Sequence, residues 1–160
     1  MRLTVAAVGR LKAGPERELA GRYLERASKL GRGMGLHPIE VVEIDESRAR
    51  RPEERIAQEG LALTALLAGD HVCVALDARG QVLTSEDFAS RLARWRDGGR
   101  GAVYFLIGGA DGLSRNLARP PDLTIAFGNA TWPHQLVRIM LLEQLYRTAT
   151  ILAGHPYHRG

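Results

Sequence analysis

The sequence predicts an α/β fold built on a parallel sheet. Short apolar stretches rich in valine, isoleucine and alanine alternate with longer segments of helical period along the 160 residues. Two stretches, 72–76 and 102–107, are continuous apolar runs, which is typical of strands buried on both faces of a parallel sheet. We expect a single domain over residues 1–160, a length at which folding buries roughly 68–70% of the unfolded surface.

The N-terminal half is predicted to contain two strands, each followed by a helix. Pro15 favours the start of the first helix, because the fixed φ of proline suits a first helical turn. Gly69 favours the end of the second helix, because glycine readily adopts the left-handed conformation found there. The predicted elements are strands at 3–8 and 39–44 and helices at 15–30 and 52–67.

The C-terminal half is predicted to continue this alternation with three more strands. Thr84 and Ser85 precede two acidic residues, an N-cap signal for a helix that ends at Gly98. The apolar run that begins at Val72 is expected to end at Leu76, before a polar turn. The predicted elements are strands at 72–76, 102–107 and 123–127, a helix from 85 to about 95, a short helix after Ser114, and a long helix over 133–152.

The composition argues against membrane insertion, export and disulfide bonding. The longest apolar run has six residues, whereas a membrane-spanning helix needs roughly 20. The apolar stretch 3–8 is too short for the core of a signal peptide, so we expect a cytoplasmic protein. Cys73 is the only cysteine, which excludes an internal disulfide and a cysteine-based zinc cluster.

The basic residues are almost all arginine. The chain has 22 Lys and Arg against 18 Asp and Glu, and all of the cations except Lys12 and Lys29 are arginines. The planar guanidinium pairs well with phosphate, so the charge is compatible with a nucleic-acid partner. A genome that encodes arginine in place of lysine explains the same excess, and charge alone leaves both interpretations open.

Three loops are candidates for a ligand site. In open parallel sheets ligands bind beyond the carboxyl ends of the strands, where we expect loops at 76–80, 108–114 and 127–134. The three glycines of the second loop permit positive φ angles and a close approach of a ligand, which indicates a nucleoside pocket lined by backbone. A tight turn alone would explain the same glycines. The loop lacks P-loop and Rossmann spacing, which argues against ATP and NAD.

The last predicted helix is apolar nearly all round. Such a helix is buried on more than one side, and we expect a second copy of the chain, in a homodimer, to cover one side. Glu143 and Arg147 are spaced for an ion pair within the helix, which we interpret as structural. His134 is expected at the N-terminal end of this helix, facing the third loop, where a lone histidine is usually a structural hydrogen-bonding residue.

The C-terminal tail groups polar and aromatic residues that are unusual for a solvated terminus. Tyr157 could stack on a base, Arg159 could hold a phosphate, and His155 or His158 could accept or position a proton. Zinc binding by the two histidines is a competing interpretation. No cysteine or acidic residue accompanies them, so we expect no metal site.

Several motifs in fixed order, spread over the whole length, resemble one family. They are LIGGADGLS at 106–114, TWPHQLVR at 131–138, EQLYR at 143–147 and HPYHR at 155–159. Together they resemble the bacterial RlmH proteins, which are 23S rRNA pseudouridine N3-methyltransferases of the SPOUT class.

The resemblance implies both a fold and a cofactor. It implies a homodimer and a parallel-sheet SPOUT fold with a C-terminal deep trefoil knot, whose cofactor-binding part covers about residues 72–160. The cofactor it implies is S-adenosyl-L-methionine, with no metal. The cofactor-binding residues it implies are Leu76, Gly108, Phe127, Gly128, Asn129, Ala130, Thr131 and Trp132.

The resemblance also implies a substrate and a role for the tail. The acceptor is a pseudouridine in the helix 69 hairpin of 23S rRNA, methylated at N3 on the assembled 70S ribosome. The tail is expected to reach the site of the partner subunit, which makes His155, Tyr157, His158 and Arg159 the candidate catalytic residues.

Two other functions remain alternatives at the level of sequence. One is a non-catalytic ribosome-binding module of the same fold, which would bind ribosomes without the cofactor. The other is an α/β enzyme acting on a small metabolite, which would turn over without RNA. Two arginine clusters are candidate ribosome-binding surfaces, although solvated helix faces explain them as well. They are Arg48, Arg50, Arg51 and Arg55, and Arg91, Arg94, Arg96 and Arg100.

Overall fold

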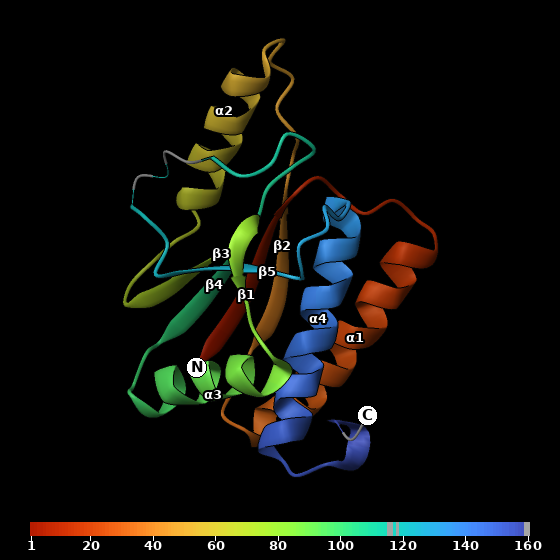
Figure 1. Cartoon of the computed structure of the whole chain (residues 1–160), viewed down its shortest axis with the longest axis vertical. Helices are drawn as coiled ribbons and strands as arrows, with labels where there is room; N and C mark the ends of the chain where they lie inside the picture. The colour runs from red at the N-terminus through yellow and green to blue at the C-terminus, as the bar shows by residue number, and fades with distance from the viewer. Residues whose placement is uncertain (115–116, 118, 159–160) are drawn as a thin grey trace.

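Five strands form one parallel sheet in the order β2-β1-β4-β3-β5, as the computed structural model shows for residues 1–114, 117 and 119–158 (Figure 1). In the paired register, Val5 of β1 lies between Val41 of β2 and Phe105 of β4. Because the strands are parallel, their carboxyl ends meet at one edge of the sheet, called here the carboxyl edge. The strands are β1 (Arg2–Val8), β2 (Ile39–Ile44), β3 (His71–Val82), β4 (Ala102–Ile107) and β5 (Leu123–Ala126).

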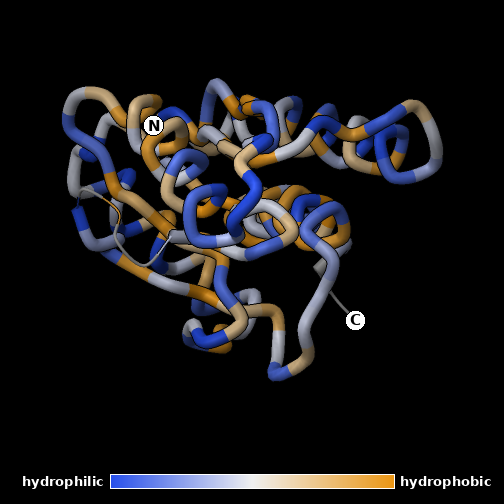
Figure 2. The backbone as a smooth tube through the Cα atoms, turned by 90° about the horizontal axis from the view of Figure 1, so that it is seen from above, coloured by the Kyte–Doolittle hydropathy of each residue, from blue (hydrophilic) through white to orange (hydrophobic). Residues whose placement is uncertain are grey.

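The helices cover the two faces of the sheet unequally. Three helices pack on one face, whose core includes Ala27, Leu92 and Leu142, whereas α2 covers the other face through Leu63 (Figure 1). Hydrophobic and hydrophilic positions alternate along the helical turns when the molecule is seen from above (Figure 2). The helices are α1 (Pro15–Gly33), α2 (Pro52–Thr64), α3 (Ser85–Asp97) and α4 (His134–Leu152), followed by the 3₁₀ turn η1 (Pro156–His158).

The helix signals in the sequence correspond to helix ends in the structure. Pro15 lies in the first turn of α1, as predicted. The Oγ1 atom of Thr84 accepts a hydrogen bond of 3.0 Å from the backbone N–H of Asp87, which confirms the predicted cap of α3. The second helix was predicted to reach residue 67, but α2 ends at Thr64.

The third strand is longer than predicted, and the expectation that it ends at Leu76 is wrong. The chain leaves the ladder after Leu76, and Gln81 and Val82 then pair with β5 again. Gly80 makes this return possible, because a Cβ atom there would lie 2.5 Å from the backbone carbonyl carbon of Ile125. The short helix predicted after Ser114 falls on residues 115, 116 and 118, which lie outside the described residues.

The apolar character of α4 is largely explained within one subunit. Leu141, Leu142 and Leu145 are at most 1% exposed, in the core that α4 shares with the sheet, α1 and α3. The apolar side chains near its N-terminal end that remain most exposed are Trp132 and Leu136, at 43% and 39%. No helix in the described part of the chain is long and apolar enough to span a membrane.

Candidate active site

A cavity of about 600 Å³ lies at the carboxyl edge, beyond the ends of β4 and β5 and beside the irregular part of β3. Leu76, Ile107 and Ala126 form its floor. The walls come from the three segments that the sequence singled out: residues 77 and 78, where β3 leaves the ladder, the glycine-rich segment 108–113, and the segment 127–134 that leads into α4. The cavity thus lies where open parallel sheets bind their ligands, and its volume suits a cofactor.

The glycine-rich loop closes tightly on itself. A Cβ atom at position 108 would lie 2.3 Å from the carbonyl oxygen of Gly112 and 2.6 Å from the backbone nitrogen of Leu113. The backbone N–H of Gly112 donates a hydrogen bond of 3.0 Å to the carbonyl oxygen of Gly109. Gly112 itself has a φ of 92°, a conformation that favours glycine. Any side chain at position 108 would therefore displace the loop that walls the cavity.

An indole ring closes the third loop. The Nε1–H group of Trp132 donates a hydrogen bond of 3.0 Å to the carbonyl oxygen of Phe127. Gly128 forms the turn between them at a φ of 91°. The structure brings six of the eight predicted cofactor residues to the cavity wall: Leu76, Gly108, Phe127, Ala130, Thr131 and Trp132. Gly128 and Asn129 belong to the same loop but are not among the lining residues.

His134 gives the cavity a titratable group at the first residue of α4. Burial lowers the pKa of His134 below its ordinary value, and the charge of Glu46 opposes part of this shift. Burial therefore favours the neutral form of the imidazole in the cavity wall. The sequence placed His134 correctly at the helix end facing the third loop.

Arg138, the last residue of the 131–138 motif, has a structural role that the sequence alone did not reveal. Its side chain is 1% exposed, and Nη1 donates to the carboxylate of Glu43 at the end of β2. Nη2 donates a hydrogen bond of 2.8 Å to the carbonyl oxygen of Gly9. A charge within an otherwise apolar helix needs buried partners, and that was the available signal. Arg138 thus ties the cavity end of α4 to the ends of β1 and β2.

The tail residues lie at the other end of α4. The Tyr157 hydroxyl donates a hydrogen bond of 3.2 Å to Oε1 of Glu143, and its ring centroid lies 4.6 Å from that of Tyr146. Burial raises the pKa of Tyr157. The predicted ion pair between Glu143 and Arg147 is present, with an Oε1 to Nη2 distance of 2.7 Å. The contacts of Tyr157 with Glu143 and Tyr146 thus anchor the tail to α4 of its own chain.

The cavity and the tail are far apart within one subunit. The 19 residues of α4 extend over about 28 Å, with the cavity at one end and the 3₁₀ turn η1 beyond the other (Figure 1). His155 accepts a hydrogen bond from the backbone N–H of Tyr157 and is exposed. The side chain of His158 and all of Arg159 lie outside the described residues. One chain therefore does not bring His155 or Tyr157 to its own cavity.

Metal ligands do not cluster in the part of the chain that the structure describes. No group of three or more histidine, cysteine, aspartate or glutamate side chains there could hold an ion. Cys73 is buried in β3, and burial raises the pKa of its thiol to about 11. The thiol is therefore protonated at neutral pH, and Cys73 is a residue of the hydrophobic core.

Comparisons with known proteins agree with the fold. A family model described as "Predicted SPOUT methyltransferase" matches residues 1–158. A methylase family protein from Neisseria gonorrhoeae has a similar structure, with a TM-score of 0.50 over 91% of this chain and 80% of that chain. Its sequence identity is 15%, so this likeness concerns the fold alone.

Curated relatives align over the full length of the chain. Proteins named ribosomal RNA large subunit methyltransferase H are 60% identical in Bradyrhizobium diazoefficiens, 58% in Rhodopseudomonas palustris and 57% in Xanthobacter autotrophicus. Each alignment covers 100% of this chain and 100% of the relative. The chain belongs to the SPOUT methyltransferase family and, within it, to the group of these H-type proteins.

Proposed function

We propose that the protein transfers a methyl group from S-adenosyl-L-methionine to N3 of a pseudouridine in the helix 69 hairpin of 23S rRNA, on the assembled 70S ribosome. The cavity at the carboxyl edge is the observation that carries this proposal. It is walled by the three loops that the family resemblance assigned to the cofactor, in a chain whose relatives are named as ribosomal RNA methyltransferases. An rRNA substrate also places the protein in the cytoplasm.

The residues present fit this cofactor. Leu76 of β3 and Ile107 at the end of β4 offer an apolar floor, and the glycine-rich loop allows backbone to approach a ligand closely at Gly108. We infer that the other lining residues at 127–132 complete the binding site, with Gly128 and Asn129 shaping the loop behind it. Neutral His134 adds no repulsion toward a sulfonium cation.

The protein has a limited chemical task in this reaction. The cofactor supplies an already activated methyl group when bound. The chain's own residues exclude water, hold the acceptor nitrogen in line and favour its deprotonated form. An imide nitrogen is weakly acidic, so a cation that stabilises its anion lowers the barrier. His155, Tyr157, His158 and Arg159 are the groups that we assign to this acceptor side.

A homodimer is the arrangement that joins the two halves of this site. The cavity and the tail lie at opposite ends of α4 in one chain, so the tail is proposed to serve the cavity of the partner subunit. Trp132 and Leu136, exposed beside the cavity, offer an apolar surface for the second copy. We also infer the deep trefoil knot over about residues 72–160. The knot is supported by the strand order, in which β3 lies between β4 and β5, because the loops that follow β4 and β5 wall the cavity.

Two measurements on one preparation test this proposal. Isothermal titration with S-adenosyl-L-methionine should give one binding isotherm, and labelled methyl transfer should then be measured on 70S ribosomes and on free 23S rRNA. Transfer to 70S ribosomes and not to free 23S rRNA is the expected result. Absence of cofactor binding would overturn the assignment of the cavity. Binding to ribosomes without transfer would favour a non-catalytic module, and turnover without RNA would favour a metabolite enzyme.

A further inference from the structure

The connection between β2 and α2 carries three exposed arginines beside the candidate active site. Arg48, Arg50 and Arg51 lie in the segment 47–51, which we call the arginine loop. This loop follows the end of β2 and therefore lies at the carboxyl edge, as the cavity does. Among the described residues, these three side chains form one ion pair, with 3.9 Å between Arg51 Nε and Glu54 Oε1 and with both side chains largely exposed.

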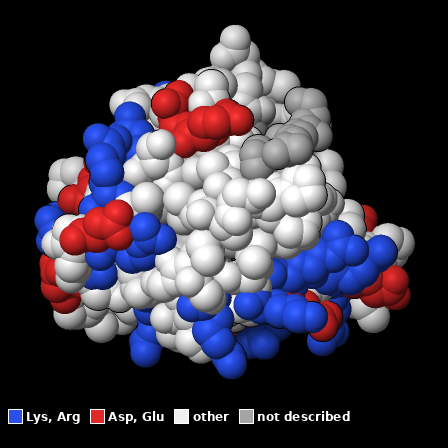
Figure 3. Space-filling view, turned by 90° about the horizontal axis from the view of Figure 1, so that it is seen from below, with Lys and Arg blue, Asp and Glu red and all other residues white. Residues whose placement is uncertain are grey.

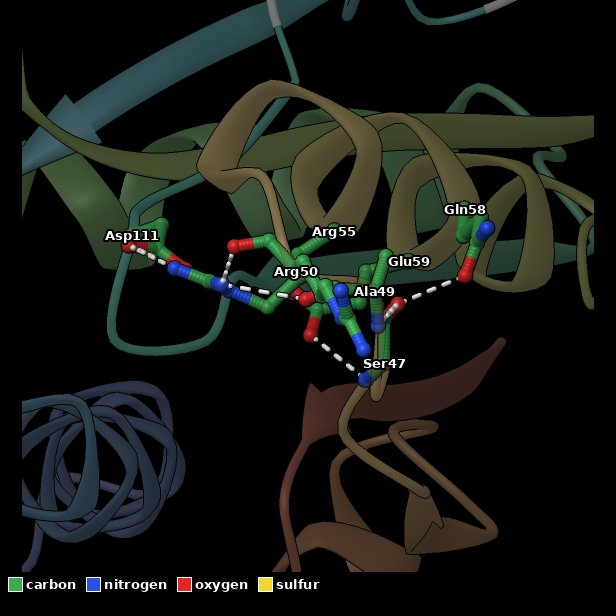
Figure 4. Close-up of polar contacts among 7 residues, drawn as sticks. All are labelled: Ser47, Ala49, Arg50, Arg55, Gln58, Glu59 and Asp111. Carbon is green, nitrogen blue, oxygen red and sulfur yellow. Dashed lines mark hydrogen bonds and ion pairs between the residues drawn. The ribbon is translucent and has the colours of Figure 1, made fainter.

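One arginine of α2 fastens this loop to the wall of the cavity. The guanidinium of Arg55 is bidentate to Asp111, with Nε to Oδ2 at 2.7 Å and Nη2 to Oδ1 at 3.1 Å. Its Nη1 donates to the carbonyl oxygens of Ala49 and Arg50 at 3.1 and 3.0 Å (Figure 4). The hydrogen bond from Arg55 also lowers the pKa of Asp111. Because Asp111 belongs to the glycine-rich loop, one side chain links the two loops.

Further residues of α2 hold the same two loops. The carboxylate of Glu59 accepts a hydrogen bond of 2.9 Å from the backbone N–H of Ser47 (Figure 4). Its other oxygen, Oε2, is buried and would lie 3.0 Å from a Cβ atom at position 109. Gly60 packs so closely that a Cβ atom there would lie 2.7 Å from Cβ of Ser114. The α2 helix thus contacts both the arginine loop and the glycine-rich loop and holds them in fixed positions relative to each other.

We propose that the arginine loop is the docking surface for the phosphate backbone of the substrate RNA, held in register with the cavity by the Arg55–Asp111 clamp. The proposal rests on the proposed function. Exposed guanidinium groups recognise phosphate through a planar fork, and contacts to phosphate fix register while carrying no sequence information. A loop whose backbone is fixed beforehand loses less conformational entropy on binding.

The other arginine cluster fits this role less well. Arg100 lies just before β4, at the amino ends of the strands, whereas the cavity lies at their carboxyl ends. The six residues of β4 separate the two by about 20 Å. Three of its four arginines already have partners within the chain: Arg96 binds Asp97, Arg100 binds Asp70 at 2.6 Å, and Arg91 reaches Gln81. The view from below shows two groups of basic side chains with acidic side chains among them (Figure 3).

Two triple variants that remove the same charge test the docking surface. One is Arg48→Ala with Arg50→Ala and Arg51→Ala, and the matched control is Arg91→Ala with Arg94→Ala and Arg100→Ala. The Kd for S-adenosyl-L-methionine and the KM and kcat for 70S ribosomes are measured over a series of KCl concentrations. The loop variant should raise the ribosome KM by about tenfold or more. It should also reduce the slope of log KM against log KCl concentration by about 2–3, since each phosphate contact contributes roughly 0.7–0.9 to that slope.

The control variant and the cofactor Kd separate the possible failures. We expect the control to change KM less than about twofold, and neither variant to change the cofactor Kd. Equal losses in both variants, or a raised KM with an unchanged salt slope, would overturn RNA docking; the second result would point to a protein partner on the ribosome. If the wild-type protein transfers no methyl group to ribosomes, the proposed function fails first, independently of the loop.

A third variant tests the clamp against simple electrostatics. Asp111→Asn removes a negative charge near the loop, so attraction to phosphate alone predicts a lower ribosome KM. The clamp predicts a higher KM, because Arg55 loses its bidentate partner and the two loops lose their register. Arg55→Lys keeps the charge and should also raise KM with an unchanged salt slope. A lower KM in Asp111→Asn, with the cofactor Kd unchanged, would contradict the positioning role.

Discussion

The two ends of α4 are built in different ways. At the N-terminal end, backbone and apolar side chains wall a cavity, and buried Arg138 fastens the helix to the ends of β1 and β2. At the C-terminal end, aromatic and charged side chains are grouped, and Tyr157 packs on Tyr146 and Glu143 of its own chain. The first end suits the binding of a small cofactor, and the second carries groups suited to a base and to phosphate.

Under the proposed function, this difference makes one subunit an incomplete site. Helical geometry keeps the ends of α4 about 28 Å apart, and the contacts of Tyr157 hold its tail at the far end. Small movements of side chains cannot bring the tail residues to the cavity of the same subunit. A second copy can, because a twofold axis places the same surface on both subunits and exchanges their ends.

The largest effect is expected from a side chain added at the cavity end. Gly108→Ala, and more severely Gly108→Val, should weaken cofactor binding by more than about 1,000-fold, or ~4 kcal/mol. The cause is displacement of the glycine-rich loop, because the new Cβ atom meets the backbone of Gly112 and Leu113 before it fills the cavity. Isothermal titration measures the loss. Gly21→Ala is the matched control, since a Cβ atom there meets nothing within 4 Å, and it should bind normally.

The next largest effect is expected at the tail end. Tyr157→Ala and His158→Ala should leave the cofactor Kd unchanged and lower methyl transfer to ribosomes by about 100-fold, since positioned proton-transfer and stacking groups contribute on this scale. Labelled methyl transfer is the measurement. Tyr157→Phe keeps the packing on Tyr146 and loses the polar contacts of the hydroxyl with Glu143 and Tyr23, so it should retain more activity. Unchanged transfer in both alanine variants would contradict the acceptor-side assignment.

A third prediction concerns how the cavity end is anchored. Arg138→Met should lower the free energy of unfolding by about 2 kcal/mol, because it leaves the buried carbonyl oxygen of Gly9 without its donor and Glu43 without its ion pair. Urea denaturation measures this change. Arg94→Met on the exposed face of α3 is the control and should stay within about 0.5 kcal/mol of wild type. Equal stability of the two variants would mean that Arg138 is not an anchor.

The smallest effect concerns pH. Burial holds the pKa of His134 below the value of an unfolded histidine, so the unfolded chain binds more protons in the acid range. The contribution of His134 to stability is therefore complete above pH 6.5 and falls as pH drops through the lowered pKa. Cofactor affinity should fall a few-fold over the same range, as imidazolium repels the sulfonium. His134→Gln should flatten both profiles, and identical profiles in the variant would exclude His134 as their cause.

The position of the candidate site could be predicted from the sequence, whereas the full course of β3 beside it could not. Continuous apolar runs mark buried parallel strands, and the loops after them must gather at the carboxyl edge, so Leu76, Gly108 and Phe127 were found together. Local patterns do not encode how far a strand continues after a break. The return of β3 depends on Gly80 passing close to the backbone of Ile125, a contact between segments distant in sequence.

Side-chain partners were equally hard to predict. Arg138 and Glu43 are 95 residues apart, and Arg55 and Asp111 are 56 apart, so neither pair has a signature within one segment. The ion pair of Glu143 and Arg147, four residues apart on one helix, was predicted because helical spacing alone specifies it. The placement of the tail on its own helix also depends on tertiary packing of Tyr157, which composition does not reveal.

Mixed dimers test the central claim most directly, namely that the cavity of one subunit acts with the tail of the other. Gly108→Val and Tyr157→Ala chains with different tags are co-expressed, and the dimer that carries both tags is isolated and assayed for methyl transfer to ribosomes. Each parent should keep no more than about 1% of wild-type activity, but in the mixed dimer one cavity and one tail remain intact on opposite subunits. That dimer should regain about half of wild-type activity, or about a quarter in an unfractionated equal mixture. Activity that stays at the level of the parents would show that cavity and tail do not act across subunits.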